Sequence, residues 1–496
     1  MIKFNVTVAK PETVQTGLLV IGVKKDEFEK NAIIKKLDEK LGGILSQVLK
    51  KEKFEGKAGQ SKLFHSHNKL DAEYLYIAGL GDGKGFDAEN IRKIAGGIYK
   101  TAQGLRINNV SFTLLAHGFK KLDTDQIAQA ITEGFDLASY VFSRYKPIPK
   151  DAHEIDTVQI ICEKADKSTV EKALHRGLAL AKGVKLARDL INTPAQDMTP
   201  LALADAATNF TNVTTKILKI PEIKKLKMGA YLGVAQGAIN PPAFIEMHYK
   251  PTGKAKKVVA IVGKGVTFDS GGLSIKPAKS METMKDDMSG SAAVIGLMSV
   301  ISELAPKVEV WGIVAAAENA VDANSQRPGD IVTAMNGKTI EVLNTDAEGR
   351  LTLADACHYA VQKKPDYIID IATLTGACLV ALGDRISAIL GNDKDLIQSL
   401  ISAGKKAGEA LWEMPLAQEY KEELKSPIAD LKNIGGSYGG TINGALFIGE
   451  FVGDTKWAHL DIAGPSWTEK PKEYESRGGT GVMVKTLAEL LKKLSH

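Results

Sequence analysis

"KVVAIVGKGVTFDSGG", residues 257–272, joins an apolar run to a glycine-rich stretch that carries one lysine and one aspartate. A short run rich in valine and isoleucine is typical of a buried strand. Lys264 and Asp269 follow this run, and the polar groups that bind ligands in α/β proteins gather at the carboxyl ends of strands. The stretch therefore predicts a strand that leads into a functional loop.

Four further apolar runs of similar length indicate that this strand belongs to a larger sheet. They are "PAFIEMHY" (242–249), "VEVWGIVAAAE" (308–318), "YIIDIAT" (367–373) and "WAHLDIAG" (457–464). Strands that alternate with helical segments are typical of an α/β domain. We expect a larger C-terminal α/β catalytic domain over residues 191–496, with a mixed central sheet flanked by helices.

The first third of the chain predicts a second, smaller α/β domain over residues 1–150. Its strand candidates are "GLLVIGV" (17–23), "YLYIAGLG" (74–81) and "VSFTLLAHG" (110–118), and "DAENIRKIAGGIYKTAQGL" has a helical pattern. The polar, proline-bearing passage at 143–156 favours a domain boundary, and a helix from about 168 to 191 would follow. Residues 151–190 are therefore predicted as a linker and connecting helix.

A glycine-rich segment in the first domain, "GLGDGKG" (79–85), raises the question of a phosphate-binding loop. Its lysine is followed by glycine instead of serine or threonine, and the segment lacks the GxGxxG spacing. We predict a plain turn between a strand and a helix.

Composition narrows the class of protein but not its function. The chain has 496 residues, of which 44% are hydrophobic and 25% charged, so it is typical of a globular protein with more than one core. The net charge of +5 is small and gives weak support to nucleic-acid binding. Three cysteines without CxxC spacing indicate neither a disulfide framework nor a thiolate zinc site. With no signal-peptide pattern and no membrane-spanning run, we expect a cytoplasmic protein without a membrane partner.

A second acidic stretch, "NTDAEGRLTLADA" (344–356), places Asp346, Glu348 and Arg350 within five residues. An ordinary solvated loop ahead of a helix would explain it in isolation. The apolar "IEVLN" precedes it, and Asp287 precedes the small-residue run "SGSAAVIGLM", which predicts a helix. Because the carboxyl ends of strands meet at one edge of a sheet, we expect these carboxylates to converge with Lys264 and Asp269.

Three segments resemble the defining motifs of the leucine aminopeptidase (cytosol aminopeptidase) family: "VGKGVTFDSGGLSIKP", "NTDAEGRLTLADA" and "DIATLTGA". The resemblance continues through "NIGGSYGGTINGALF" (433–447) and "WAHLDIAGP" (457–465) in the same order. It implies a leucyl aminopeptidase, a metallo-exopeptidase that hydrolyses N-terminal residues, preferably leucine and other apolar ones, from peptides by a two-metal mechanism.

The resemblance also implies the ligands of two divalent metal ions. They are Lys264, Asp269, Asp287, Asp346 and Glu348. Asp269 and Glu348 would bridge both ions. The residues agree with this assignment, because four crowded carboxylates repel one another and two divalent ions would neutralise them. A ligand set rich in oxygen and free of thiolate suits zinc or manganese, with cobalt or magnesium also possible.

Lys276 and Arg350 remain as the catalytic pair that the resemblance implies. Lys276 would stabilise the oxyanion, and Arg350 would hold a bicarbonate ion that acts as general base. Four further positions match the family's side-chain pocket, although ordinary core packing is the alternative for them: Met284, Thr373, Leu374 and Gly376. The chain departs from the common pattern at Ser289 and Ser291, where small Gly and Ala are usual, and this places the local fit in question.

Other interpretations remain open at this point. A two-metal phosphoesterase would also use clustered carboxylates and a lysine. An additional DNA-binding role is known in some bacterial members of the family that the chain resembles. The family also implies a homohexamer. The chain has no HExxH motif, so a single-zinc protease with two helical histidine ligands is not supported.

Overall fold

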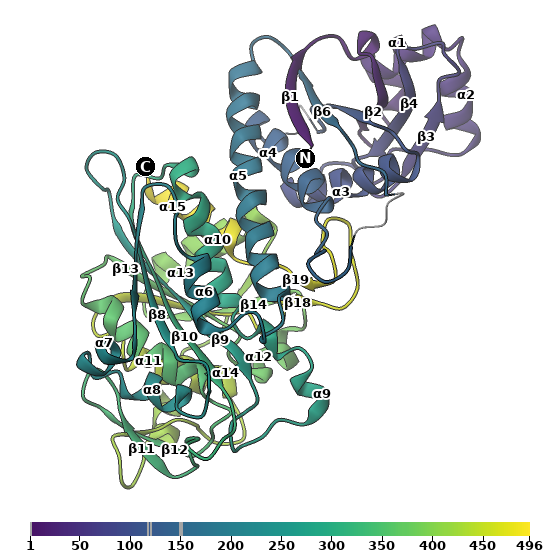
Figure 1. Ribbon diagram of the computed structural model, residues 1–496. Coiled ribbons are helices and arrows are strands. Elements are labelled where there is room, and N and C mark those ends of the chain that lie inside the picture. The colour runs from purple at the N-terminus through teal and green to yellow at the C-terminus, as the bar shows by residue number, and fades with distance from the viewer. Residues whose placement is uncertain (1, 117–118, 120–121, 148–151) are drawn as a thin grey trace. The chain divides into compact units, whose positions relative to one another are not determined.

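The computed structural model describes residues 2–116, 119, 122–147 and 152–496. The chain divides into two compact units, one of Met1–Ala181 with Pro471–Ser476 and one of Lys182–Lys470 with Arg477–His496. Each unit has its own sheet and its own helices (Figure 1). The predicted α/β class, with a smaller N-terminal and a larger C-terminal domain, is confirmed.

The N-terminal unit is built on a six-stranded sheet of order β1-β6-β5-β2-β4-β3. Five strands run parallel, and only the edge strand β3 is antiparallel to its neighbour. The strands are β1 (Lys3–Val8), β2 (Thr16–Val23), β3 (Ser61–His65), β4 (Ala72–Gly79), β5 (Asn109–Thr113) and β6 (Thr157–Cys162).

Helices cover both faces of this sheet. The buried side chains of α1 (Ala32–Lys40) and α2 (Ile44–Lys51) pack on one face, with Leu19 and Ile21 of β2. Those of α3 (Ala88–Gly104) and α4 (Thr124–Ala138) pack on the other face, with Leu18 and Val20. The alternation along β2 explains why its sequence reads as a continuous apolar run.

The predicted N-terminal strands correspond to β2, β4 and β5, and "GLGDGKG" forms the turn between β4 and α3 as predicted. The strands β1, β3 and β6 were not predicted. In β1 and β3, polar residues interrupt the apolar ones or alternate with them. The segment expected to link the domains contains β6 and the long helix α5 (Lys167–Asn192). Residues 117–118 of one predicted strand and 148–151 near the expected boundary lie outside the described residues.

The C-terminal unit is built on an eight-stranded sheet of order β15-β14-β17-β13-β9-β10-β8-β7. Its four central strands, β17, β13, β9 and β10, are parallel, and antiparallel pairs flank them, so the sheet is mixed as predicted. The strands are β7 (Val213–Leu218), β8 (Ala243–Tyr249), β9 (Val258–Asp269), β10 (Glu309–Asn319), β13 (Tyr367–Ala372), β14 (Ile386–Gly391), β15 (Ala410–Glu413) and β17 (Lys456–Asp461).

Helices α10 (Ser289–Leu304), α13 (Lys394–Ala407) and α15 (Val484–Leu494) lie on one face of this sheet (Figure 1). The other face carries α8 (Gly229–Ala235), α11 (Gly349–Val361) and α14 (Gly440–Gly449). Smaller elements complete the unit: α6 (Pro200–Ala206), α7 (Ile220–Lys225), α9 (Ala278–Met281), α12 (Gly376–Leu382), β11 (Asp330–Thr333), β12 (Thr339–Val342), β16 (Leu431–Lys432), β18 (Trp467–Thr468) and β19 (Gly478–Gly479).

The strand β9 continues six residues beyond the predicted apolar run and ends at Asp269. A β-carbon at Gly263 would lie 2.6 Å from the Cα of Ser291, so glycine is needed for α10 to approach the strand. This close approach brings the residues that precede α10 to the carboxyl end of β9. Among the described residues, no helix combines the length and the apolarity that crossing a bilayer requires.

Candidate metal centre and active site

The five predicted metal ligands come together, although they lie on three separate segments. Lys264 and Asp269 belong to β9, Asp287 lies between a short 3-10 turn and α10, and Asp346 and Glu348 lie between β12 and α11. The predicted route of convergence was wrong in one respect. β12 belongs to a separate three-stranded sheet with β11 and β16, so its loop reaches the central sheet from outside it.

Lys264 lies buried between two of the carboxylates, Asp287 and Glu348. Its Nζ lies 2.6 Å from Asp287 Oδ1 and 2.8 Å from Glu348 Oε1, and it donates to the carbonyl oxygen of Thr373 at 3.0 Å. A β-carbon at Gly349 would lie 2.7 Å from the same Nζ, so the first residue of α11 must be small. The side chain of Lys264 is 3% exposed, and these carboxylates balance its charge.

Lys276 lies between the other two carboxylates, Asp269 and Asp346. Its Nζ lies 2.9 Å from Asp269 Oδ2 and 2.5 Å from Asp346 Oδ1. Carboxylate oxygens of Asp269, Asp346 and Glu348 all lie within 4.8 Å of one another. Three carboxylates at this separation can share a cation, and the two lysines provide the positive charge in this structure.

The carboxylates of this cluster resist ionisation together. Burial raises the pKa of Asp287 and of Asp269, and the neighbouring charge of Glu348 raises both further. Burial alone would lower the pKa of Lys264 and Lys276, but the adjacent carboxylates raise both above the usual value. Both lysines are therefore held charged here, and the acidic cluster favours any additional cation.

Arg350 lies apart from the ion pairs, in the first turn of α11. It is 8% exposed, and its Nη1 donates to the carbonyl oxygen of Asn433 at 2.9 Å. Its buried Nε has no hydrogen-bond partner, and among the described residues it forms no ion pair with a carboxylate. Burial lowers the pKa of Arg350 to about 10. A buried guanidinium with a free donor is suited to binding a small anion.

Several residues that sequence reasoning did not assign hold the site in shape. Asn319, the last residue of β10, donates from Nδ2 to Asp269 Oδ1 at 2.7 Å and to the carbonyl oxygen of Thr345 at 3.0 Å. Thr345 Oγ1 in turn donates to the carbonyl oxygen of Gly271 at 2.7 Å. The signal was available, because Asn319 ends a strand parallel to β9 and so reaches the same edge of the sheet.

Asn433 and Asp461 do the same for two other loops. Asn433 Nδ2 donates to the carbonyl oxygen of Asn344 at 2.7 Å, which orders the turn ahead of Asp346. Asp461, the last residue of β17, accepts from Thr375 Oγ1 at 2.7 Å and from the backbone N–H of Leu374 at 3.2 Å. Both residues lie in segments that the sequence singled out, but their own roles were not predicted.

The four predicted pocket residues differ in their relation to the cluster. Thr373 Oγ1 donates to Asp287 Oδ1 at 2.8 Å, so it touches the centre directly. Leu374 is partly buried against the core, Met284 is half-buried, and Gly376 is exposed with no neighbour near its missing side chain. The unusual Ser289 turns inward, where its hydroxyl donates to the carbonyl oxygen of Asp286 at 2.5 Å.

The donor set fits divalent metal ions on an observation within the site. Asp287 Oδ2 is buried and has no hydrogen-bond partner. The other carboxylates around it repel its negative charge, and a bound cation would offset that repulsion. Oxygen donors with one amine are suited to hard or borderline divalent ions. Fold and site together define an α/β metalloenzyme whose centre is built from carboxylates and lysine.

Comparisons with known proteins identify the family. The model of the cytosol aminopeptidase family catalytic domain matches residues 185–488, and the model of its N-terminal domain matches residues 19–148. A probable cytosol aminopeptidase of Alkaliphilus oremlandii is 39% identical over 99% of both chains. One from Rippkaea orientalis is 43% identical over 95% of both.

Solved structures agree with these relatives. A variant of tomato leucine aminopeptidase aligns with a TM-score of 0.89 at 37% identity, over 99% of this chain and 97% of that one. The bottromycin maturation enzyme BotP in complex with Mn aligns with a TM-score of 0.84 at 31% identity, over 97% and 100%. The chain belongs to the cytosol aminopeptidase family. It is an aminopeptidase, a metal-dependent hydrolase that acts at the N-terminal end of peptides.

Proposed function

We propose that this enzyme removes leucine and other apolar N-terminal residues from peptides with two divalent ions per chain. One observation carries the proposal: oxygens of Asp269, Asp346 and Glu348 lie within 4.8 Å of one another, between two lysines. Lys264, Asp269, Asp287, Asp346 and Glu348 would hold the ions, with zinc or manganese preferred and cobalt or magnesium possible. When bound, the ions would supply Lewis acidity and a nucleophilic water at neutral pH.

Lys264 would exchange its ion pairs for a role as ligand, because an amine can donate its lone pair to a metal only when deprotonated. The positive charge of neighbouring ions would favour that neutral form. Thr373 would keep Asp287 oriented, and Asn319 would do the same for Asp269, since each donates to one oxygen and leaves the other for a cation.

Lys276 would act as the electrostatic catalyst. It is not assigned as a ligand, its charge is held by two carboxylates, and its side chain is 15% exposed, so it faces the accessible side of the centre. A fixed ammonium group next to the scissile carbonyl would stabilise the negative charge that develops on its oxygen.

Arg350 would hold a bicarbonate ion through its unpartnered Nε, and this anion would supply a general base. The buried guanidinium cannot itself accept a proton, because burial lowers its pKa only to about 10. No role as base is therefore assigned to the arginine.

The apolar first residue of the peptide would lie against Met284, Thr373, Leu374 and Gly376. Thr373 connects this border to the metal centre through Asp287, and Asp461 fixes the backbone of Leu374. The open space beside Gly376 would leave room for a branched side chain.

The resemblance to the family also supports a homohexamer in the cytoplasm. Apolar side chains on α12 fit a subunit interface, since Val380 is 88% exposed and Leu379 is 43% exposed. DNA binding would be an added function at most, because the net charge of +5 is small for 496 residues. Light-scattering mass and a mobility shift at physiological salt test these two points.

Hydrolysis of leucine p-nitroanilide against its N-acetylated analogue tests the proposal. A centre that binds the free amine requires that only the unblocked substrate turn over. Phenylalanine and aspartate p-nitroanilides then test the apolar preference. Similar rates on blocked and unblocked leucine would overturn the proposal, and hydrolysis of an aryl phosphate instead would support a phosphoesterase.

A further inference from the structure

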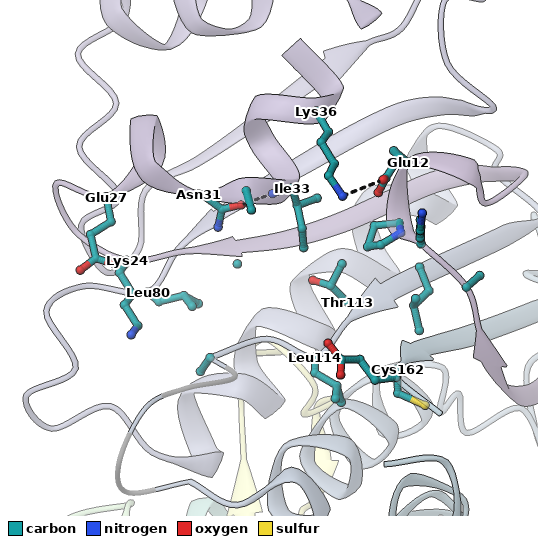
Figure 2. Close-up of a pocket in the computed structure, with 18 of the residues that line it drawn as sticks. Glu12, Lys24, Glu27, Asn31, Ile33, Lys36, Leu80, Thr113, Leu114 and Cys162 are labelled. Carbon is teal, nitrogen blue, oxygen red and sulfur yellow. Dashed lines mark hydrogen bonds and ion pairs between the residues drawn. The ribbon is translucent and has the colours of Figure 1, made fainter. Parts of the chain in front are cut away.

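The N-terminal unit contains a cavity of about 520 Å³ that the aminopeptidase reaction does not use (Figure 2). Every one of the five parallel strands contributes to its wall at or just beyond its carboxyl end. The contributing residues are Ala9 and Lys10 after β1, Gly22 and Lys24 at the end of β2, Leu80 after β4, Thr113 and Leu114 at the end of β5, and Cys162 and Glu163 at the end of β6.

The topology of the sheet explains why a cavity forms there. The neighbouring strands β2 and β5 lead into helices on opposite faces, because α1 packs on one side and α4 on the other. The chain therefore leaves a crevice between these two strands, where the direction of the connections reverses. In open parallel sheets this reversal point is where ligands bind, and nucleotides are frequent among them.

The polar groups around the cavity have two kinds of chemistry. Lys24 is half-buried, with Nζ 4.9 Å from the ring centroid of Phe119, and Lys10 and Lys30 are exposed at the mouth. None of these three lysines forms an ion pair among the described residues, whereas Lys36 is paired with Glu12 at 3.1 Å. The lysines are suited to phosphate oxygens.

Carboxylates line the same cavity and balance the formal charge of its lysines. The cavity as a whole therefore does not favour a simple inorganic anion. Glu163 and Asp166, which follow β6, line the cavity and have no ion-pair partner among the described residues. Carboxylates near the carboxyl end of a parallel strand can accept hydrogen bonds from ribose hydroxyls. Glu27 lies beside Lys24 (Figure 2), so lysines and carboxylates line the cavity together. This combination suits a ligand that carries both a phosphate and hydroxyl groups.

Apolar side chains provide the remaining surface. Ile33, Leu80 and Leu114 point into the space between the charged groups (Figure 2). A volume of this size accommodates a small organic ligand, and an apolar wall favours a flat ring. Phosphate, ribose and base thus each have a matching surface.

We propose that this cavity binds a nucleoside phosphate. The phosphate would lie at Lys24 and Lys30, and the ribose hydroxyls would donate to Glu163 and Asp166. The proposal is independent of the aminopeptidase function and adds a second ligand site to the enzyme. It assigns a binding role to the N-terminal unit.

Equilibrium dialysis of the full chain with labelled AMP and ADP tests this directly. At least one nucleotide should bind, and adenosine, inorganic phosphate and free leucine should each compete at least about tenfold more weakly. Adenosine binding as tightly as AMP would exclude the phosphate contact. The absence of binding at millimolar AMP and ADP would exclude a nucleotide as the ligand. Each of these results would overturn the proposal.

Two variants locate the site. The double variant Lys24→Glu and Lys30→Glu should weaken AMP binding at least about tenfold, because repulsion replaces two phosphate contacts. The matched control, Lys35→Glu and Lys69→Glu, changes two exposed lysines of the same unit outside the cavity and should stay within about twofold. Unchanged affinity in the first variant would place any binding elsewhere and overturn the assignment.

Ala32→Trp provides an independent test, since Ala32 is exposed at the mouth and a larger side chain there fills the cavity without entering a core. AMP binding should be lost while hydrolysis of leucine p-nitroanilide and the circular dichroism melt are kept. Full AMP binding by this variant would contradict the proposal, even if the charge variant fails to fold.

Discussion

Lys276 Nζ lies 2.9 Å from Asp269 Oδ2, so the lysine assigned to catalysis contacts a carboxylate assigned to metal binding. The contact fixes the ammonium group at the edge of the centre, and neighbouring carboxylates raise its pKa above the usual value. A fixed and permanently charged group is what electrostatic stabilisation of an oxyanion requires.

Replacement of Lys276 should therefore reduce turnover more than it reduces metal binding. We expect Lys276→Ala to lose about 10² to 10³ in kcat, the usual range for one oxyanion donor. Metal content and the melting temperature should stay close to the parent values. The matched control is Lys279→Ala, because Lys279 is an exposed lysine three residues further on and should tolerate the change. Loss of both metals from the Lys276 variant would instead make it a ligand.

Arg350 should act through a bound anion. We expect Arg350→Ala to lose about 10² to 10⁴ in kcat, the range typical of general acid–base catalysis. Added bicarbonate should stimulate the parent enzyme after carbonate-free dialysis and the Arg350 variant much less. The exposed Arg327 provides a control, since Arg327→Ala should respond to bicarbonate like the parent. Equal stimulation of all three proteins would remove the proposed role of Arg350.

Much of this site could be predicted from sequence because strand ends and motifs coincide. Lys264 and Asp269 follow an apolar run, and the predicted strands near 242–249, 308–318 and 457–464 correspond to β8, β10 and β17. The resemblance to the family is confirmed by the comparisons. The individual roles of the site residues and the domain boundaries at 150 and 190 stay predictions.

The remaining features depend on tertiary packing. The strand β9 continues through Lys264 because β10 pairs with it, although lysine and glycine interrupt the apolar pattern. The edge strand β15 was not predicted, since three of its four residues are exposed and its pattern is weak. Asn319 and Asn433 look like ordinary polar residues until their loops are placed against the acidic cluster.

Asp355 connects stability to pH away from the metal centre. It is buried in α11 and accepts from the backbone N–H of Tyr231 at 2.9 Å and of Met335 at 2.7 Å. Burial nevertheless raises the pKa of Asp355 from 3.8 to about 7. Because the folded chain holds this proton more tightly, the stabilisation is complete below the unfolded pKa and is lost as pH rises through about 7.

Asp355→Asn cannot ionise, so it removes this dependence. The free energy of unfolding of the parent minus that of the variant should fall between about pH 4 and pH 7, as measured by urea titration. Asn supplies one acceptor in place of two, so the variant should be the less stable protein at the acidic end by about 1–3 kcal/mol. The exposed Asp205 serves as control in Asp205→Asn. A difference that rises with pH would show that the carboxylate form is favoured.

Removal of metal should abolish peptidase activity without unfolding the chain. Lys264 and Lys276 already form ion pairs with the cluster, so the demetallated centre is partly neutralised. We expect manganese or zinc to restore hydrolysis of leucine p-nitroanilide after treatment with a chelator. Full activity in thoroughly demetallated protein would exclude a catalytic metal.

The number of manganese ions per chain tests the central claim most directly. Elemental analysis of the manganese-loaded enzyme after removal of free metal should give two ions per chain in the parent and fewer in Asp346→Ala. Asp205→Ala, an exposed aspartate in the same unit, should keep two. One ion or none in the parent, or two in the Asp346 variant, would contradict the account of a two-metal centre held by these residues.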